Sequence, residues 1–274
     1  MGNESHGEKR VPILAPAGRR GAAGFSLVEL LAVVAIILIL LTLLLPLLQN
    51  VQRQARLAKC QANLRQLYAG MLFDLQSRDI SRFPSYQNGR LWMDDVAAGL
   101  RDEKKMEAIR FCPEATTPSA GFAADSKHAW TWNSTSLNRG SYGLNGWMYH
   151  PYGGGAGSNG GAGYYFGNAN WPGGFWETVS EAGARAPMFA DCSWVDGWPF
   201  DDDIVPPDPN VGIASAERPT YMARFCISRH GSRGSPGINL VFCDGHVSFV
   251  SLDMLWSLKW NKTFKTQGRK VPFP

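Results

Sequence analysis

The fold of this chain is decided near its start, where residues 24–48 read GFSLVELLAVVAIILILLTLLLPLL. From Phe25 to Leu48 nearly every residue is apolar, and the run from Leu30 to Leu41 is unbroken. A helix of this length, at about 1.5 Å per residue, spans the ~30 Å hydrocarbon core of a bilayer. No later segment is comparable, so the sequence predicts a single membrane pass.

Three kinds of segment can begin with such an apolar run. A secretory signal peptide has about 7–15 apolar residues followed by a small-residue cleavage site. The run here is longer, and it ends in residues 43–48 without an Ala-x-Ala site. A plain signal anchor is the second possibility, and a leader peptide removed just before the apolar run is the third.

Two features favour the removed leader. The polar residues 1–24 end in Gly24 directly before Phe25, and Glu29 lies inside the apolar run. A lone carboxylate in hydrocarbon costs about 2.5–3.5 kcal/mol and usually marks a function. Cleavage after Gly24 would leave a new amine on Phe25, one helical turn from Glu29, which can neutralise that carboxylate within one chain or between neighbours. In an assembling helix bundle, the intermolecular pair would set the axial stagger.

The segment Gly24-Phe25-Ser26-Leu27-Val28-Glu29-Leu30-Leu31 resembles the cleavage and methylation motif of type IV prepilins and type II secretion pseudopilins. The resemblance implies that Gly24 is the last leader residue and that Phe25 becomes the N-methylated first residue. It gives Glu29 the role of the acidic residue used for methylation and assembly. Pro46 matches a proline common in pilin helices.

The same resemblance implies a structural subunit rather than an enzyme. The subunit would belong to a type II secretion pseudopilus or a type IV pilus-like filament. Its partners would be prepilin peptidase, the inner-membrane assembly machinery, membrane lipid, other copies of the chain and other pilin-like subunits.

The resemblance also implies the division of the chain. Residues 1–24 would be a cytoplasmic leader. The long helix would be 25–77, with 25–48 crossing the inner membrane once and 49–77 packed on the outer domain. Residues 78–274 would form that domain, in the periplasm or outside the cell. Basic residues flank the apolar run on both sides, so the cleavage motif, not charge, sets this orientation.

The predicted fold is α+β and pilin-like, with the long transmembrane helix packed on a small antiparallel β-sheet with irregular loops. Beyond the membrane the helix continues from Gln49 to about Ser77, and a second helix is expected from Arg90 to Arg110. Apolar residues recur at spacings of three to five along the outer part of the first helix and predict its packed face. They are Val51, Ala55, Ala58, Ala62, Leu67, Met71 and Leu75.

The C-terminal part predicts a β-hairpin. Residues 238–242 and 247–250 are mostly apolar and flank Cys243-Asp244-Gly245-His246. Asp-Gly between such runs is a hairpin signal, because both central residues of a tight two-residue turn need positive φ. We also expect a strand at 225–228 and a short closing helix at 252–258.

A second resemblance covers this region. Arg229-His230-Gly231 and the run Asn239 to Val247 are similar to the "H-X9-DG" C-terminal signature that accompanies prepilin-type N-termini, here with His230, Asp244 and Gly245. Thirteen residues, rather than nine, separate His230 from Asp244-Gly245. Three intermediate segments also resemble motifs of that group: Phe111-Cys112-Pro113, Ser141-Tyr142-Gly143-Leu144-Asn145 and Met188-Phe189-Ala190-Asp191.

Two sets of residues suggest a metal. His230, Asp244 and His246 could form a metal or catalytic site, or they could serve the hairpin turn and nearby backbone groups. Asp201 and Asp203 are candidate calcium ligands, because calcium prefers carboxylate oxygens. The alternative for them is a solvated acidic turn. Apart from possible calcium, no cofactor is predicted, and the sequence has no Gly-x-Ser-x-Gly, His-Glu-x-x-His or nucleotide-binding motif.

The five cysteines have no Cys-x-x-Cys pair, which disfavours zinc and thioredoxin chemistry. Disulfides are allowed if the outer domain faces an oxidising compartment. Cys226 could pair with Cys243 and Cys112 with Cys192, whereas Cys60 is interpreted as a small packing residue of the long helix. The sequence does not fix this connectivity.

The alternative function is a prepilin-like anchor that displays a domain binding polysaccharide or a protein partner. Its support is the glycine- and aromatic-rich segment 149–174, with Tyr164, Trp171 and Trp176 as contact residues. Nucleic acid is not an expected partner, because the net charge of +4 is small and basic and aromatic residues do not alternate in any stretch.

Overall fold

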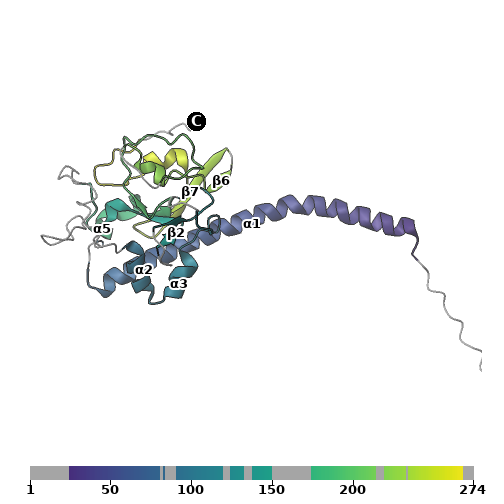
Figure 1. Cartoon of the computed structure of the whole chain (residues 1–274), viewed down its shortest axis with the longest axis horizontal. Coiled ribbons are helices and arrows are strands. Elements are labelled where there is room, and N and C mark those ends of the chain that lie inside the picture. The colour runs from purple at the N-terminus through teal and green to yellow at the C-terminus, as the bar shows by residue number, and fades with distance from the viewer. Residues whose placement is uncertain are drawn as a thin grey trace, which may run out of the picture. The chain divides into compact units, whose positions relative to one another are not determined.

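The computed structural model describes residues 25–80, 83, 91–119, 124–132, 138–149, 174–213, 219–232 and 234–267. Gly24, Tyr164 and Trp171 therefore lie outside the described residues. The chain divides into two compact units, Met1–Asn50 and Val51–Pro274. Helix α1, Leu27–Ser77, belongs to both units (Figure 1).

The first unit contains the apolar half of α1. Its start is fixed by a capping box, in which the Ser26 amide donates to Glu29 Oε2 at 2.9 Å and the Glu29 amide donates to Ser26 Oγ at 3.2 Å. Every residue from Phe25 to Asn50 is exposed. Within the described ranges, α1 is the one helix long and apolar enough to cross a membrane. The long apolar helix predicted from the sequence is confirmed, and it runs without interruption through Pro46.

The outer half of α1 packs into the second unit only from Cys60 onward. Val51, Ala55 and Ala58 are exposed, so the predicted packed face is wrong for the first two turns beyond the membrane segment. The buried residues of α1 are Cys60, Asn63, Leu64, Leu67, Gly70, Met71, Asp74 and Leu75. Three of them, Cys60, Asn63 and Asp74, have a thiol or a polar side chain, so the buried face of α1 also makes polar contacts.

The helix predicted for Arg90 to Arg110 is two helices, α2 (Trp92–Leu100) and α3 (Glu103–Ile109). They are separated at Arg101, which has a left-handed backbone with φ of 51°. Asp102 then starts α3, because its carboxylate accepts from the amides of Lys104 and Lys105. Helix α2 lies close to α1: a Cβ added to Gly99 would come 1.9 Å from the carbonyl oxygen of Gly70.

The second unit is built on a six-stranded sheet of order β5-β3-β4-β7-β6, with β8 also paired to β7. All neighbours are antiparallel except β3 and β5. Its strands are β3 (Tyr142–Asn145), β4 (Pro187–Asp191), β5 (Asp196–Gly197), β6 (His230–Ser232), β7 (Ser235–Phe242) and β8 (Val247–Ser251). A separate pair joins β1 (Trp130–Thr131) to β2 (Arg139–Gly140). The short helices are η1 (Gly146–Met148), α5 (Val179–Ala182), η2 (Gly183–Arg185), η3 (Tyr221–Arg224) and η4 (Leu252–Ser257).

Two hydrophobic cores cover the faces of this sheet. Val241 of β7 belongs to the core with the outer part of α1, α2 and α3, whereas Ile238, Leu240 and Phe242 belong to the core with η4. This alternation follows from the two-residue period of a strand. Figure 1 shows α2 and α3 on one side of the sheet and the yellow η4 on the other. The α+β, pilin-like fold class predicted from the sequence is confirmed.

The predicted C-terminal hairpin is present as β7 and β8, but its turn differs. The Gly245 amide donates to the Phe242 carbonyl at 2.9 Å, and Gly245 alone of the turn residues has positive φ, at 87°. The connection is therefore a four-residue turn with a terminal left-handed glycine, not the tight turn in which both central residues need positive φ. The closing helix is η4, a 3-10 helix. The strand predicted at 225–228 is wrong, because strand pairing begins at His230.

Candidate functional site

The candidate site lies where two strands meet end to end along β7. Strand β4 pairs with β7 up to Ala190 opposite Leu240, and β6 begins with His230 opposite Gly237. Both strands use the same edge of β7, because β8 pairs with the other edge at both places. The last residue of β4, Asp191, therefore comes next to the first residue of β6, His230.

Two cysteines from the helical layer complete the cluster. Cys60 lies on α1 and Cys112 follows α3. His230 Nε2 lies 3.2 Å from Asp191 Oδ2 and 3.3 Å from Cys112 Sγ. Cys60 Sγ lies 3.6 Å from Asp191 Oδ2 and 3.7 Å from Oδ1. The four side chains are buried, and one ligand-type atom from each lies within 4.8 Å of all the others.

A second layer of polar groups holds Asp191 in place. The Asn239 amide donates to Asp191 Oδ2 at 2.9 Å, and Arg229 Nη1 lies 3.5 Å from Oδ1. Arg229 is itself buried and donates to the carbonyl oxygens of several loop residues. These are Ser141, Cys192 at 3.2 Å, Asp125 at 2.9 Å and His128 at 3.4 Å. The Asp191 carboxylate is therefore held by the Asn239 amide and by an arginine that is itself bonded to four backbone carbonyls.

The cluster perturbs the ionisation of its members. Burial alone would raise the pKa of Asp191, but His230, Arg229 and the Asn239 amide hold that pKa below its ordinary value. Burial alone would lower the pKa of His230, but the Asp191 carboxylate and then Cys112 raise it to about 10. Burial, followed by the Cys60 thiol and the Asp191 carboxylate, raises the pKa of Cys112 well above its ordinary value. A thiol in this state is a poor nucleophile. Without a cation at the site, the residues favour a neutral thiol beside a His–Asp ion pair.

Segments that the sequence analysis considered separately meet at this cluster. Cys112, Asp191 and His230 come from three of the segments that resemble motifs of the H-X9-DG group. Tyr142, from a fourth, is buried beside them, and its hydroxyl lies 3.4 Å from Asn63 Nδ2. Cys60 and Asp191 were not among the predicted site residues. The predicted packing role of Cys60 is incomplete, since its thiol faces a buried carboxylate.

The structure does not bring His230, Asp244 and His246 together as one metal or catalytic site. His230 begins β6 opposite Gly237, whereas Asp244 and His246 follow the far end of β7. Seven residues of extended chain from Gly237 to Asp244 span on the order of 20 Å. Asp244 and His246 serve the hairpin turn, as in the alternative interpretation: the His246 amide donates to Asp244 Oδ1 at 3.0 Å, and His246 Nδ1 lies 2.6 Å from the same oxygen.

The other predicted binding residues have structural uses. Asp203 is buried, and its Oδ2 accepts from the amides of Phe200 at 2.9 Å and Met222 at 2.7 Å. Among the described residues, neither Asp201 nor Asp203 belongs to a group of three or more metal-ligand side chains. Trp176 is buried and donates from Nε1 to the Trp260 carbonyl at 3.1 Å, so its predicted role in glycan contact is wrong.

The five thiols are buried and free, so neither predicted disulfide is formed. Cys112 faces Cys60 and His230. Cys226 packs in the core that contains η4, and Cys243 in the core that contains α1.

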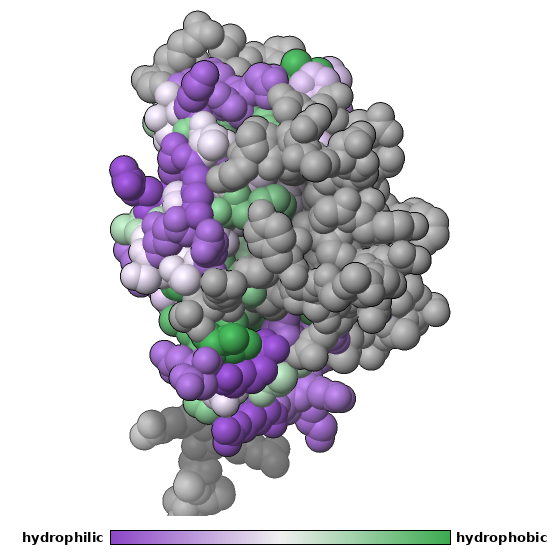
Figure 2. All heavy atoms as spheres, turned by 90° about the vertical axis from the view of Figure 1, so that its left-hand side faces the viewer, coloured by the Kyte–Doolittle hydropathy of each residue, from purple (hydrophilic) through white to green (hydrophobic). Residues whose placement is uncertain are grey.

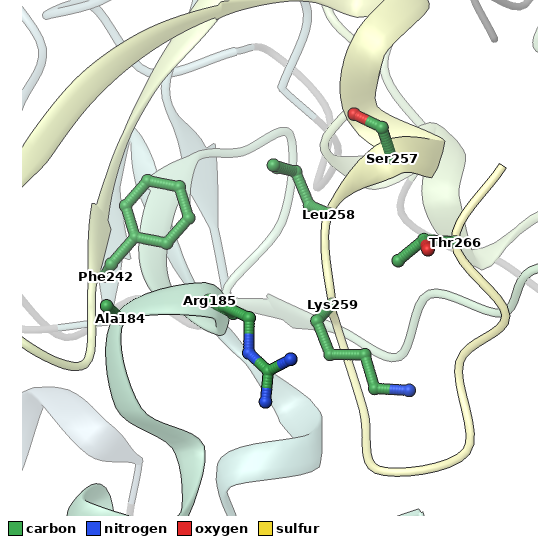
Figure 3. A pocket seen from close by; sticks show the side chains of 7 residues that line it. All are labelled: Ala184, Arg185, Phe242, Ser257, Leu258, Lys259 and Thr266. Atoms are coloured by element: carbon green, nitrogen blue, oxygen red, sulfur yellow. The ribbon is translucent and has the colours of Figure 1, made fainter. Parts of the chain in front are cut away.

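The described surface offers a shallow pocket of about 480 Å³ between η2 and the C-terminal segment (Figure 3). Arg185 and Lys259 lie on one side of it and Phe242 on another. Lys259 Nζ already donates to the Phe264 carbonyl at 2.6 Å. No carboxylate, imidazole or thiol is among the residues that line this pocket, and it shares no residue with the buried cluster.

The N-terminal residues form the second candidate site, which is identified by comparison with known protein families. Residues 19–45 match the family model described as "Prokaryotic N-terminal methylation motif". The chain carries a prepilin-type methylation motif. This motif contains Phe25 and Glu29 and leads directly into the exposed apolar half of α1. No curated protein and no solved structure matches the chain. The methylation motif indicates a pilin-like structural subunit rather than an enzyme.

Proposed function

We propose that the chain is a prepilin that is cleaved between Gly24 and Phe25, methylated at Phe25 and assembled into a type II secretion pseudopilus or a type IV pilus-like filament. The observation that carries this proposal is the methylation motif at residues 19–45, which overlaps the exposed apolar half of α1 from Leu27 to Asn50. Prepilin peptidase, other pilin-like subunits and the inner-membrane assembly machinery are the proposed partners.

The described residues support two uses for the apolar half of α1. Before assembly its exposed side chains suit lipid, and in a filament they suit the same helix of neighbouring subunits. A helix apolar on all sides is stable only when it is buried in lipid or protein. On the face shown in Figure 2, the coloured residues are mostly hydrophilic, with hydrophobic residues between them. A hydrophilic surface suits an aqueous compartment, and the cleavage motif is the basis for our proposal that residues 78–274 face the periplasm or the outside of a filament.

We expect the chain to enter the sheared filament fraction of its native host only when prepilin peptidase is active. Immunoblots of sheared, pelleted filaments would compare cells with and without the peptidase. The total membrane fraction is the control, because the apolar helix should insert in both strains. The chain in the filament fraction of peptidase-deficient cells, or its absence there when other pilin-like subunits are assembled, would contradict the proposal.

A further inference from the structure

We propose that Cys60, Cys112, Asp191 and His230 together bind one Zn²⁺ ion in a closed, structural site. The inference does not rest on filament assembly, since all four residues belong to the second unit. It also revises the expectation from cysteine spacing, because the two thiols come from residues 52 positions apart in the sequence rather than from a Cys-x-x-Cys pair.

Three of the six separations between the ligand atoms match a tetrahedral zinc site, and all six are within 4.8 Å. Zinc binds thiolate sulfur at about 2.3 Å and imidazole nitrogen or carboxylate oxygen at about 2.0 Å, so the ligand atoms of a tetrahedral site lie roughly 3.3–3.8 Å apart. His230 Nε2 is 3.2 Å from Asp191 Oδ2 and 3.3 Å from Cys112 Sγ. Cys60 Sγ is 3.6 Å from the same carboxylate oxygen. Each of these separations is within a few tenths of an ångström of a tetrahedral edge.

The ligand types select zinc over calcium or magnesium. Two sulfurs, one imidazole nitrogen and one carboxylate oxygen form a mixed soft and borderline set, whereas calcium and magnesium require oxygen ligands. His230 presents Nε2 to the cluster, so Nε2 would be the metal ligand. Binding would release the thiol protons of Cys60 and Cys112 and the Nε2 proton of the His230 imidazolium to solvent, because zinc takes thiolates and neutral imidazole.

The surrounding charges balance such an ion. Two thiolates and the Asp191 carboxylate carry three negative charges, and Zn²⁺ with the Arg229 guanidinium carries three positive charges. Arg229 lies 3.5 Å from Asp191 Oδ1, the oxygen that Zn²⁺ at Oδ2 would leave free. The Asn239 amide also donates to the Asp191 carboxylate, and hydrogen-bonded partners of this kind orient metal-binding carboxylates in known sites. The buried set would therefore be electrically neutral when the ion is bound.

A disulfide between Cys60 and Cys112 is the competing use of the two thiols. It would account for two members of the cluster and leave the His230–Asp191 pair unexplained. The arrangement instead places sulfur, nitrogen and oxygen from four separate segments around one point. Four protein ligands with full burial are typical of a structural rather than a catalytic zinc site. The ion would fasten α1 to the junction of β4 and β6.

The test uses the full chain, extracted in detergent under anaerobic, reducing conditions, incubated with Zn²⁺ alone and desalted. Zinc per chain would be measured by mass spectrometry for the wild type, Cys112→Ser and the control Cys226→Ser. The control replaces a thiol that is equally buried but packs in the core with η4. We expect one zinc per chain in the wild type and the control, and at least a tenfold lower content in Cys112→Ser. Removing the ion from the wild type should lower Tm by roughly 10 °C or more.

X-ray absorption at the zinc edge of the wild type provides a test that needs no variant. We expect two sulfur and two nitrogen or oxygen neighbours, at about 2.3 and 2.0 Å. The proposal would be overturned by a zinc coordination shell without sulfur or by a wild type that retains no zinc. Equal zinc contents in Cys112→Ser and Cys226→Ser would also overturn it. A Cys60–Cys112 disulfide in protein isolated anaerobically without reductant, with free thiols blocked at lysis and the pairing found by peptide mass mapping, would overturn it in favour of the competing use.

Discussion

Replacing Glu29 by valine is expected to leave the chain in the membrane and to remove it from the filament fraction. Glu29 lies in the first turn of α1, in the part of the helix that is exposed on all sides. Valine removes a carboxylate that costs about 2.5–3.5 kcal/mol in hydrocarbon, so insertion should not suffer. It also removes the partner for the Phe25 amine of the same or a neighbouring subunit. Because this pair is proposed to set the stagger of the helices, we expect at least a tenfold loss of the chain from sheared filaments.

The measurement combines membrane extraction with alkaline carbonate, immunoblots of sheared filaments and the mass of the N-terminal peptide. Glu29 also caps the helix through Ser26, so two controls are needed to distinguish the loss of the acid from the loss of the cap. Ser26→Ala removes the cap partner and keeps the acid, and Glu29→Asp keeps the acid with a shorter side chain. Both should retain substantial assembly. Filaments at wild-type levels from Glu29→Val would contradict the proposed pairing.

Replacing Arg229 by methionine is expected to destabilise the second unit by about 3–5 kcal/mol, the range seen when one partner of a buried ion pair is removed. Methionine fills similar apolar volume but cannot donate a hydrogen bond. It would leave Asp191 without its guanidinium and free the carbonyl oxygens of Cys192 and Asp125 from Arg229. Asp191 and Cys192 are fully buried and Arg229 itself is 2% exposed, so water cannot readily replace the lost partner.

Urea unfolding of the full chain in detergent, followed by tryptophan fluorescence, would measure this loss. Arg185→Met is the matched control, since the same substitution is made at an exposed arginine. Exposed substitutions of this kind change stability by less than about 0.5 kcal/mol. If the two variants unfolded at the same urea concentration, the buried arginine would not have the supporting role assigned to it.

The methylation motif and the apolar helix could be predicted from the sequence because their signals are local. The apolar run, Gly24 next to Phe25 and Glu29 within the run all lie in one short segment, and a single helix fixes their relation. The hairpin was accessible for the same reason, since Asp244-Gly245 lies between its two strands. Even so, the break at Arg101 was missed, because one residue with φ of 51° divided a continuous helical pattern.

The buried cluster of Cys60, Cys112, Asp191 and His230 could not be predicted from local sequence signals. Cys60 and Asp191 are 131 residues apart, and their proximity depends on α1 packing over the end of β4. His230 reaches Asp191 only because β4 and β6 follow one another along the same edge of β7, a feature of sheet order that no local pattern contains. The available signal was the presence of Cys112, Asp191 and His230 in separate motif-like segments. His230 was considered as a ligand only together with Asp244 and His246, which are near it in the sequence but follow the far end of β7.

The central claim is that the chain is processed as a prepilin, and the N-terminus of the mature protein tests it most directly. The protein would be extracted from membranes of its native host, and its N-terminal residue and intact mass determined. We predict a chain that begins with N-methylated Phe25 and lacks residues 1–24. A chain that still begins with Met1, in cells with an active prepilin peptidase, would contradict the account.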